Sequence, residues 1–189
     1  MTPTLLPDLF PPSFNQLLRD RLQRSAEWRL CLDEHYLPGM DAQAHSDTGF
    51  VYYTYSNDRD WDQIAAQDPA RGYFNGLAES MLNAALTKLG HSQAVIMRIM
   101  WNYYNRSSQG IMHRDHQVPG LHSMVYNLSG TDGGTEIDGE FYPGAEGSAI
   151  VFPSELNHRG FGPRQQPNRF VLNCIFSVET PINNDIKGA

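Results

Sequence analysis

The feature that most constrains the fold of this chain is a succession of short β-forming runs between residues 94 and 178. The longest are AVIMRIMWNYY at 94–104 and NRFVLNCIFSV at 168–178. Turn signals such as SGTDGG at 129–134 separate the runs. Shorter runs lie at 109–115, 121–128, 134–142, 147–152 and 157–161. Strands that recur at roughly 8–12 residue intervals are typical of a sandwich, jelly roll or barrel, and we therefore predict a β-core of this kind.

Residues 1–90 have a different pattern, in which helical periodicity dominates. Apolar residues recur at helical spacing over 13–28, behind a Pro-Pro-Ser start, and again in FNGLAESMLNAALTKL at 74–89. A third helix is predicted in DRDWDQIAA at 58–66, whereas FVYYTY at 50–55 is predicted to form a strand.

The length of 189 residues is close to the usual size of one domain, and nothing between the two halves has the composition of a linker. We expect a single domain over 1–189, of the α+β class and mainly β. In this domain a mainly helical part at 1–90 packs on one side of a β-core at 91–180, which carries the candidate site. Residues 181–189 are expected to form a tail.

Charge and cysteine content exclude several classes of protein. A formal charge of −7 gives the chain no general attraction for nucleic acid or for anionic lipid, and neither partner is expected. Cys31 and Cys174 are too few for a disulfide framework, which favours a reducing cytoplasm. The N-terminal segment lacks the features of a secretory signal, and no apolar run approaches ~18 residues, so no membrane anchor is expected.

The residues that could carry chemistry begin with His113 and Asp115. In a strand over 109–115 these two side chains would share one face and Arg114 the other. A third candidate, His158, lies 45 residues beyond His113, after a run that has the pattern of a buried strand. Two imidazoles and one carboxylate on one side of an octahedral ion leave three positions open, which is the arrangement that suits Fe(II), a bidentate co-substrate and O₂.

A basic residue that could bind a carboxylate follows the second candidate histidine in the sequence. Arg169 lies 11 residues beyond His158 and opens the last long strand, where its guanidinium could bind a carboxylate in a bidentate pair. Arg164, inside the polar segment NHRGFGPRQQPNR, is the alternative. Strand alternation places Arg169, Val171 and Asn173 on the cavity face, with Phe170, Leu172 and Cys174 toward the helices.

These motifs, in this order, resemble the Fe(II)/2-oxoglutarate-dependent oxygenases, and most closely their prolyl-hydroxylase-like group. The resemblance covers about residues 95–178. It consists of the aromatic segment WNYYN at 101–105, the HxD motif, the Gly-Gly turn that ends SMVYNLSGTDGG, a segment from Gly147 to Pro153, the distal histidine and the basic residue.

The resemblance implies a double-stranded β-helix, also called a jelly roll or cupin-like fold, and specific roles for several residues. Fe(II) would be held by His113, Asp115 and His158. The C5 carboxylate of 2-oxoglutarate would be held by Arg169. Four further residues are candidates for the co-substrate pocket, namely Tyr104, Asn102 on the same face, Tyr103 as a fallback and Tyr126. Because an aspartate occupies the position at which halogenating relatives have a small residue, hydroxylation is favoured over halogenation.

The implied reaction consumes 2-oxoglutarate and O₂, hydroxylates a substrate, and releases succinate and CO₂. The substrate could be a prolyl residue, a free amino acid or another small molecule, and the oligomeric state is open. Three other readings of the same residues remain. An inactive relative that serves only as a binding module is disfavoured by the complete set of three candidate ligands, which leaves two. One is a cupin-like metal-binding protein or isomerase that does not use 2-oxoglutarate, and the other is a zinc site with three protein ligands and one water.

Overall fold

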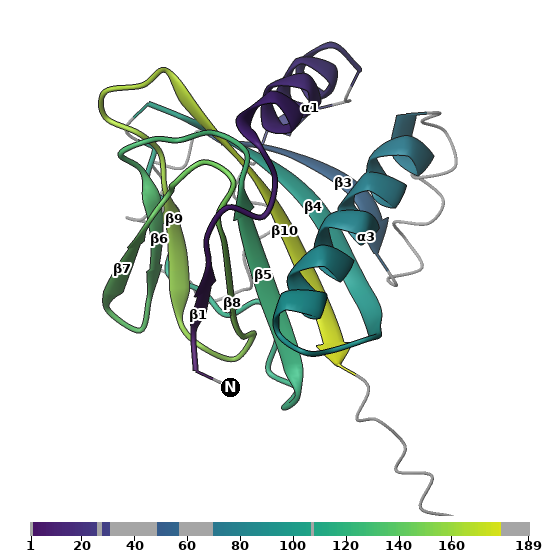
Figure 1. Cartoon of the computed structure of the whole chain (residues 1–189). Coiled ribbons are helices and arrows are strands. Elements are labelled where there is room, and N and C mark those ends of the chain that lie inside the picture. The colour runs from purple at the N-terminus through teal and green to yellow at the C-terminus, as the bar shows by residue number, and fades with distance from the viewer. Residues whose placement is uncertain (1, 26–27, 31–48, 57–69, 107, 179–189) are drawn as a thin grey trace, which may run out of the picture.

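The computed structural model describes residues 2–25, 28–30, 49–56, 70–106 and 108–178, which form two antiparallel sheets and two helices (Figure 1). The helices are α1 (Pro12–Ser25) and α3 (Ala70–Lys88). The strands are β1 (Thr4–Leu6), β2 (Arg29–Leu30), β3 (Phe50–Ser56), β4 (Ala94–Asn105), β5 (Leu121–Asn127), β6 (Gly134–Ile137), β7 (Glu140–Pro143), β8 (Ala149–Pro153), β9 (His158–Phe161) and β10 (Asn168–Val178).

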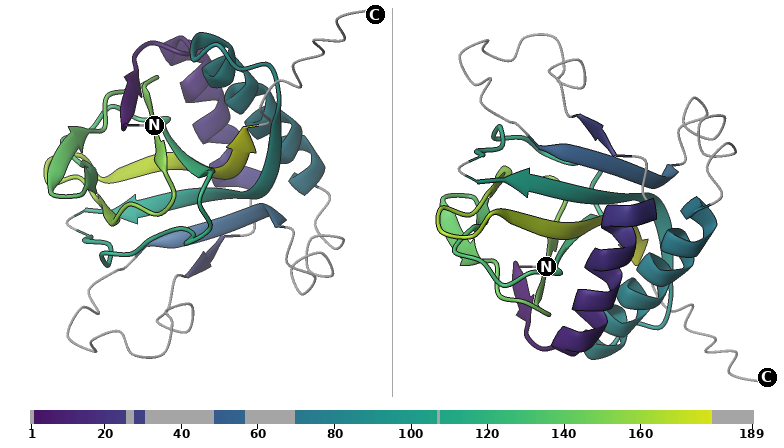
Figure 2. Two further views of the ribbon diagram at one scale, coloured as in Figure 1. Left: turned by 90° about the horizontal axis from the view of Figure 1, so that it is seen from below. Right: turned by 90° about the horizontal axis from the view of Figure 1, so that it is seen from above.

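The larger sheet has seven strands in the order β1-β8-β5-β10-β4-β3-β2, and the smaller has three in the order β7-β6-β9. β10 lies at the centre of the larger sheet, between β5 and β4. The smaller sheet lies on the far side of the molecule from α3 (Figures 1 and 2). This mainly β architecture, with few helices, agrees with the predicted jelly-roll class.

The two faces of β10 have different neighbours. Phe170, Leu172 and Cys174 are buried in a cluster that also contains Leu22 of α1 and Phe74 of α3. The other face contributes Val171 to a second cluster, which lies between the sheets. Its buried members are Val125, Ile137, Ile150, Phe152 and Val171. The predicted alternation along β10 is therefore confirmed, and it separates a helix-covered face from a face that looks toward the smaller sheet.

Most of the predicted strands occur within one or two residues of their expected bounds. The run at 134–142 is a hairpin of β6 and β7, and its turn residues Asp138 and Gly139 both have positive φ, 46° and 86°. A two-residue turn with two positive φ angles matches the right-handed twist of the strands it connects. α3 begins at Ala70, four residues before the predicted helix, and its end is followed by Gly90 at φ 80°.

Three expectations need comment. The run at 109–115 is not a regular strand, because it pairs with β9 only through isolated bridges, Gln109 with Phe161 and His113 with His158. Residues 1–90 also contain more strand than was expected, since β1 and β2 were not predicted and both join the larger sheet. The helix predicted at 58–66, the tail at 181–189 and Cys31 lie outside the described residues. Neither α1 nor α3 is long and apolar enough to cross a membrane.

Candidate metal centre

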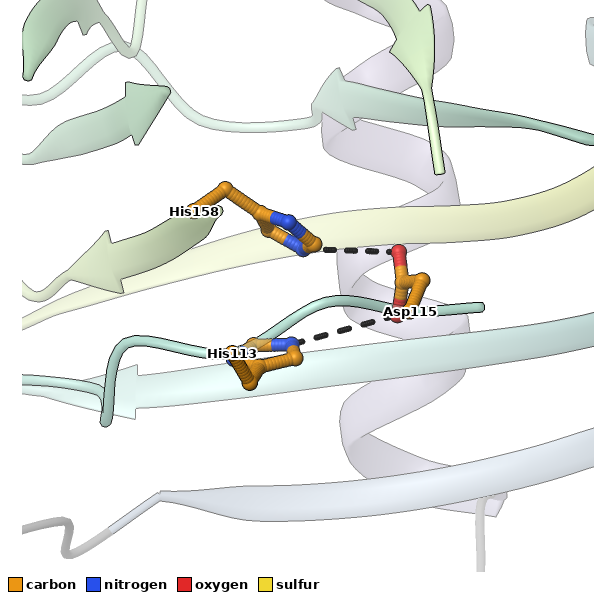
Figure 3. A group of neighbouring side chains, drawn as sticks. All are labelled: His113, Asp115 and His158. Atoms are coloured by element: carbon orange, nitrogen blue, oxygen red, sulfur yellow. Dashed lines mark ion pairs between the residues drawn. The ribbon is translucent and has the colours of Figure 1, made fainter. Parts of the chain in front are cut away.

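Backbone pairing brings the two distant histidines together. The N–H of His113 donates to the carbonyl of His158 at 2.9 Å, and the N–H of His158 donates to the carbonyl of His113 at 2.8 Å. The two rings consequently lie 4.4 Å apart, centroid to centroid. Figure 3 shows both rings turned toward Asp115, which comes from the same segment as His113. Local extended pairing, without a full strand, is thus enough to assemble the site.

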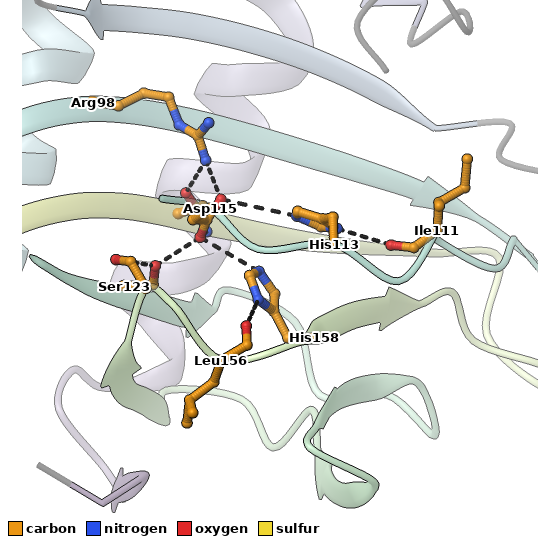
Figure 4. Close-up of polar contacts among 9 residues, drawn as sticks. Arg98, Ile111, His113, Asp115, Ser123, Leu156 and His158 are labelled. Atoms are coloured by element: carbon orange, nitrogen blue, oxygen red, sulfur yellow. Dashed lines mark hydrogen bonds and ion pairs between the residues drawn. The ribbon is translucent and has the colours of Figure 1, made fainter. Parts of the chain in front are cut away.

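Hydrogen bonds to backbone carbonyls set the tautomer of each imidazole. Nδ1 of His113 lies 2.8 Å from the carbonyl oxygen of Ile111, and Nδ1 of His158 lies 3.0 Å from that of Leu156 (Figure 4). Because a carbonyl can only accept, each Nδ1 carries the proton, and each Nε2 is left with a lone pair. Such bonds orient metal-ligating histidines in proteins.

The Nε2 atoms of both histidines lie close to the carboxylate oxygens of Asp115. Nε2 of His113 is 3.9 Å from Oδ1 of Asp115, and Nε2 of His158 is 3.4 Å from Oδ2. One nitrogen or oxygen from each of the three residues lies within 4.8 Å of the others. Two imidazole nitrogens and one carboxylate oxygen at this separation form one face of a coordination site and leave the opposite positions free.

Three further side chains fix Asp115, whose carboxylate is almost fully buried. Arg98 forms an ion pair with Oδ1, the hydroxyl of Ser123 donates to Oδ2 at 2.7 Å, and the amide of Asn173 donates to Oδ2 at 3.4 Å (Figure 4). Burial opposes ionisation of this carboxyl, but the Arg98 guanidinium and the two imidazoles outweigh it and hold its pKa well below the usual range. The ligand is therefore a carboxylate at neutral pH.

The two histidines have different electrostatic surroundings. Burial, helped by the neighbouring His158, lowers the pKa of His113. Burial also disfavours the protonated form of His158, but the hydrogen bond and the charge of Asp115 outweigh that effect and raise its pKa. Since metal binding requires neutral imidazole, a divalent cation among these groups would displace the proton that His158 otherwise attracts.

The three residues open onto a cavity of about 610 Å³ between the two sheets. Alternate residues of β4 form one wall, namely Arg98, Met100, Asn102 and Tyr104. The other contributions come mainly from β3, β5, β6, β9, β10 and the segment at 112–117. The predicted candidates Asn102, Tyr103 and Tyr104 all line this cavity, together with the three candidate ligands.

Arg169 lies behind the wall at the Tyr104 end and is 1% exposed. Its guanidinium donates to the side-chain oxygen of Asn127 at 2.8 and 3.2 Å and to the Thr135 hydroxyl at 3.1 Å, and it also reaches the carbonyls of Gly134 and Phe161. No acidic side chain among the described residues pairs with it. Burial lowers its pKa to about 10, so the group remains a cation at neutral pH.

Two other predicted candidates are placed away from the cavity. Arg164 is exposed in the loop before β10, where its backbone N–H donates to Asp132. Tyr126 faces the helices, and its hydroxyl donates to the side-chain oxygen of Asn15 at 2.5 Å. The residue of β5 that lines the cavity is Val125. The prediction that Tyr126 belongs to the co-substrate pocket is therefore corrected, because the pleat of β5 turns it to the opposite face.

Sequence reasoning missed four residues that the structure brings to the site. Arg98 could have been found, since it shares the two-residue alternation of Asn102 and Tyr104 along β4. Asn173 was placed on the correct face without being given a role. Ser123 and Thr135 had no signal, because each reaches its partner through pairing between strands that are distant in sequence.

Comparisons with known proteins agree with this architecture. No family model matches the chain, and no curated protein matches it. A prolyl-4-hydroxylase from Pseudomonas putida superposes with a TM-score of 0.58 at 14% identity, over 94% of this chain and 93% of that one. An oxidoreductase of the 2OG-Fe(II) oxygenase family from Burkholderia pseudomallei gives 0.57 at 17%, over 93% and 84%.

A third solved structure is HygX from Streptomyces hygroscopicus with nickel, 2-oxoglutarate and hygromycin B bound. It gives a TM-score of 0.60 at 11% identity, over 93% of this chain and 82% of that one. At these identities the likeness concerns the fold. The resemblance inferred from the sequence motifs is thus confirmed at that level, and the chain has the fold of the 2-oxoglutarate- and Fe(II)-dependent oxygenases.

Proposed function

We propose that this protein is an Fe(II)- and 2-oxoglutarate-dependent dioxygenase that hydroxylates its substrate. The observation that carries the proposal is one cavity with two features: a three-residue ligand set with one open side, and a buried cation without an acidic partner behind the wall at the Tyr104 end. The shared fold supports the proposal but would also be compatible with other chemistry.

The residues present fit an iron ion. Two neutral imidazoles with lone pairs on Nε2 and one ionised carboxylate are the donors that non-heme Fe(II) sites use, with the remaining positions open. Structural zinc sites instead close their coordination with four protein ligands, and no fourth His, Cys, Asp or Glu joins this cluster in the described part of the chain.

The residues also fit 2-oxoglutarate. A guanidinium that is 1% exposed and lacks an acidic partner is costly unless an anion compensates its charge. Tyr104 and Thr135 line the cavity directly in front of Arg169, whose guanidinium carbon lies 5.5 Å from the centroid of the Tyr104 ring. The distal carboxylate of the co-substrate would therefore be bound at this end by Arg169, with the Tyr104 and Thr135 hydroxyls beside it.

When bound, iron and 2-oxoglutarate would activate O₂, so that one of its oxygen atoms enters a C–H bond of the substrate and the other ends in succinate, with CO₂ released from 2-oxoglutarate. The protein contributes geometry and charge. His113, Asp115 and His158 hold three positions on one side, while the partners of Asp115 keep it ionised and oriented. Apolar side chains of Met100, Val125 and Val171 line the wall and limit the access of water.

The substrate would enter from the side that β3 and the segment at 112–117 form. Phe50, Tyr53 and Gln117 line the cavity there. Among the solved structures with this fold, one is a prolyl-4-hydroxylase and another holds hygromycin B, so both a prolyl residue and a small molecule are substrate classes to test.

Succinate formation tests the proposal. The metal-free protein is loaded anaerobically with Fe(II), supplied with 2-oxoglutarate and then exposed to air. We expect loss of 2-oxoglutarate to equal the succinate formed, and His158→Ala to abolish both. Metal binding without any consumption of 2-oxoglutarate, with prolyl peptides and free amino acids supplied as substrates, would favour the cupin-like alternative.

A further inference from the structure

Arg98 stands at the opposite end of the cavity from Arg169. Its position on β4 is six residues before Tyr104, which pairs with Arg169, so the two ends lie about 20 Å apart at ~3.3 Å per residue. Asp115, one of the three candidate ligands, pairs directly with Arg98. The Arg98 side chain is 24% exposed and lines the cavity beside Asp115 (Figure 4).

Part of the Arg98 guanidinium has no hydrogen-bond partner. Nη2 donates both to Asp115 and, at 3.1 Å, to the side-chain oxygen of Asn173. Nε is buried without a hydrogen-bond partner. The hydrogen bonds of this guanidinium to described residues come from Nη2, which leaves Nη1 for a further acceptor. A guanidinium has five donors, and leaving buried ones unpaired costs free energy. The side chain therefore has capacity for one more acceptor.

The balance of charge changes once the site is filled. In the structure Arg98 is neutralised by Asp115, but a divalent metal ion would share that carboxylate. The metal ion, Asp115, a dianionic 2-oxoglutarate and Arg169 together carry no net charge, which leaves the positive charge of Arg98 uncompensated beside the metal. Arg98, Arg114 and Asp115 are the charged residues, apart from histidines, among the described residues that line the cavity. The cavity is thus cationic in a chain whose formal charge is −7.

We propose, on the basis of the function proposed above, that the substrate carries a carboxylate and that Arg98 binds it. Arg98 would have one uncompensated positive charge and part of its guanidinium would be without a hydrogen-bond partner. A ligand with one negative charge fits this site, which favours a carboxylate over a phosphate dianion. The substrate class is then a small carboxylic acid, such as a free amino acid, and not an internal prolyl residue of a protein.

The test compares each acid with its own amide. Wild-type protein with Fe(II) and 2-oxoglutarate is offered free amino acids, the matching carboxamides, phosphate monoesters and peptides with an internal proline, and succinate formed above the substrate-free rate is measured. We expect at least one acid to exceed its amide in kcat/KM by at least tenfold, the ratio expected when one charge-assisted hydrogen bond is lost.

Variants separate substrate binding from orientation of Asp115. Arg98→Gln should bring the acid-to-amide ratio close to one, and Arg98→Lys should keep part of it. A purely positioning role would instead lower the rates for acid and amide by the same factor. Arg106→Gln is the matched control, because Arg106 is exposed, bonds the carbonyls of Gln165 and Gln166, and does not line the cavity, so its ratio should equal that of the wild type.

Several results would overturn the inference while leaving the proposed function in place. They are equal turnover of acids and amides, preference for a phosphate monoester or an internal prolyl peptide, and equal losses in Arg98→Gln. Failure of every acid to stimulate succinate formation, with metal and 2-oxoglutarate both bound by calorimetry, has the same meaning. Absence of 2-oxoglutarate binding would instead refute the proposed function, and the inference with it.

Discussion

At the scale of single residues, Arg169 shows how a hydrogen-bond count and a charge count can differ. Its donors are satisfied by Asn127, Thr135 and two backbone carbonyls, so the side chain is held rigidly without a ligand. Neutral acceptors do not remove a positive charge, however, and a buried charge is costly until an opposite charge approaches. Because all five N–H donors of the guanidinium are already used, the carboxylate of 2-oxoglutarate would have to replace one of these neutral acceptors.

Arg169→Ala should therefore weaken 2-oxoglutarate binding at least tenfold, which corresponds to ~1.4 kcal/mol or more. Arg164→Ala should change the dissociation constant by no more than about twofold, because that side chain is exposed in the loop. Calorimetry with Mn(II) in place of Fe(II) measures both. Arg169→Lys keeps the charge without the planar fork and should be intermediate, and it remains informative if the alanine variant does not fold. A larger loss in the Arg164 variant would move the anion site into the loop.

The two tyrosines considered for the co-substrate pocket should behave in opposite ways. Tyr104→Phe removes a hydroxyl beside the proposed carboxylate and should raise the KM for 2-oxoglutarate. Tyr126→Phe removes a hydrogen bond to Asn15 and should leave that KM unchanged while lowering the free energy of unfolding by about 1 kcal/mol. Urea unfolding and succinate kinetics on both variants test this, and an altered KM in Tyr126→Phe would contradict the placement of that side chain.

At the scale of elements, β9 and β4 approach each other closely at a glycine. A Cβ on Gly160 would lie 2.5 Å from the Tyr104 hydroxyl oxygen and 2.7 Å from its ring carbon Cζ, so a side chain there must displace the tyrosine. Gly160 is only two residues from His158, on a strand that begins with that ligand. One small residue thus lets a metal-ligating strand lie against the wall that faces Arg169.

Gly160→Ala should accordingly weaken 2-oxoglutarate binding more than metal binding, since the displaced group is Tyr104. Gly76→Ala is the matched control, because nothing lies within 4 Å of a Cβ at that position of α3. An alanine inside a helix should stabilise the protein by roughly 0.5–1 kcal/mol relative to glycine, with unchanged ligand affinity. Equal affinities for 2-oxoglutarate in the two variants would show that the approach of β9 to Tyr104 has no role in binding.

The elements also show what sequence periodicity can predict. β10 was predicted with its bounds because a long apolar run rich in β-formers is typical of a buried strand, and its two faces follow from the two-residue period of a strand. β1 was missed, since three residues carry no periodicity and their place in the sheet depends on pairing with β8, which is distant in sequence. The segment that holds His113 and Asp115 was predicted as a strand, but isolated bridges and side-chain contacts define its path. The convergence of the three candidate ligands could therefore be predicted from the motifs, whereas the partners of Asp115 required the tertiary structure.

At the scale of the whole molecule, the two faces of the larger sheet have different roles, because one packs against the helices and the other faces the candidate site. Its helix-covered face holds the larger apolar cluster, with Trp101, Phe170 and Leu172 against α1 and α3. The candidate ligands lie on the other side, at a cavity between the sheets. α1 is tied to the rest by Arg19, which pairs with Glu146 at 2.8 Å. Removing a ligand side chain should consequently affect the site without unfolding the protein.

Metal binding should then appear as a gain in thermal stability that depends on the ligands alone. At a free metal concentration of 100 times its dissociation constant, a site present only in the folded state adds about 2.7 kcal/mol, or roughly 5–10 °C in Tm for a chain of this size. His113→Ala and His158→Ala should keep the metal-free Tm within a few degrees and lose most of the shift, whereas His91→Ala, at the end of α3, should keep it. Because the metal competes with the proton that Asp115 stabilises on His158, whose pKa is raised, the shift should shrink as the pH falls through the range in which His158 becomes protonated. A full Mn(II)-induced shift in His158→Ala would show that the metal binds elsewhere on the molecule.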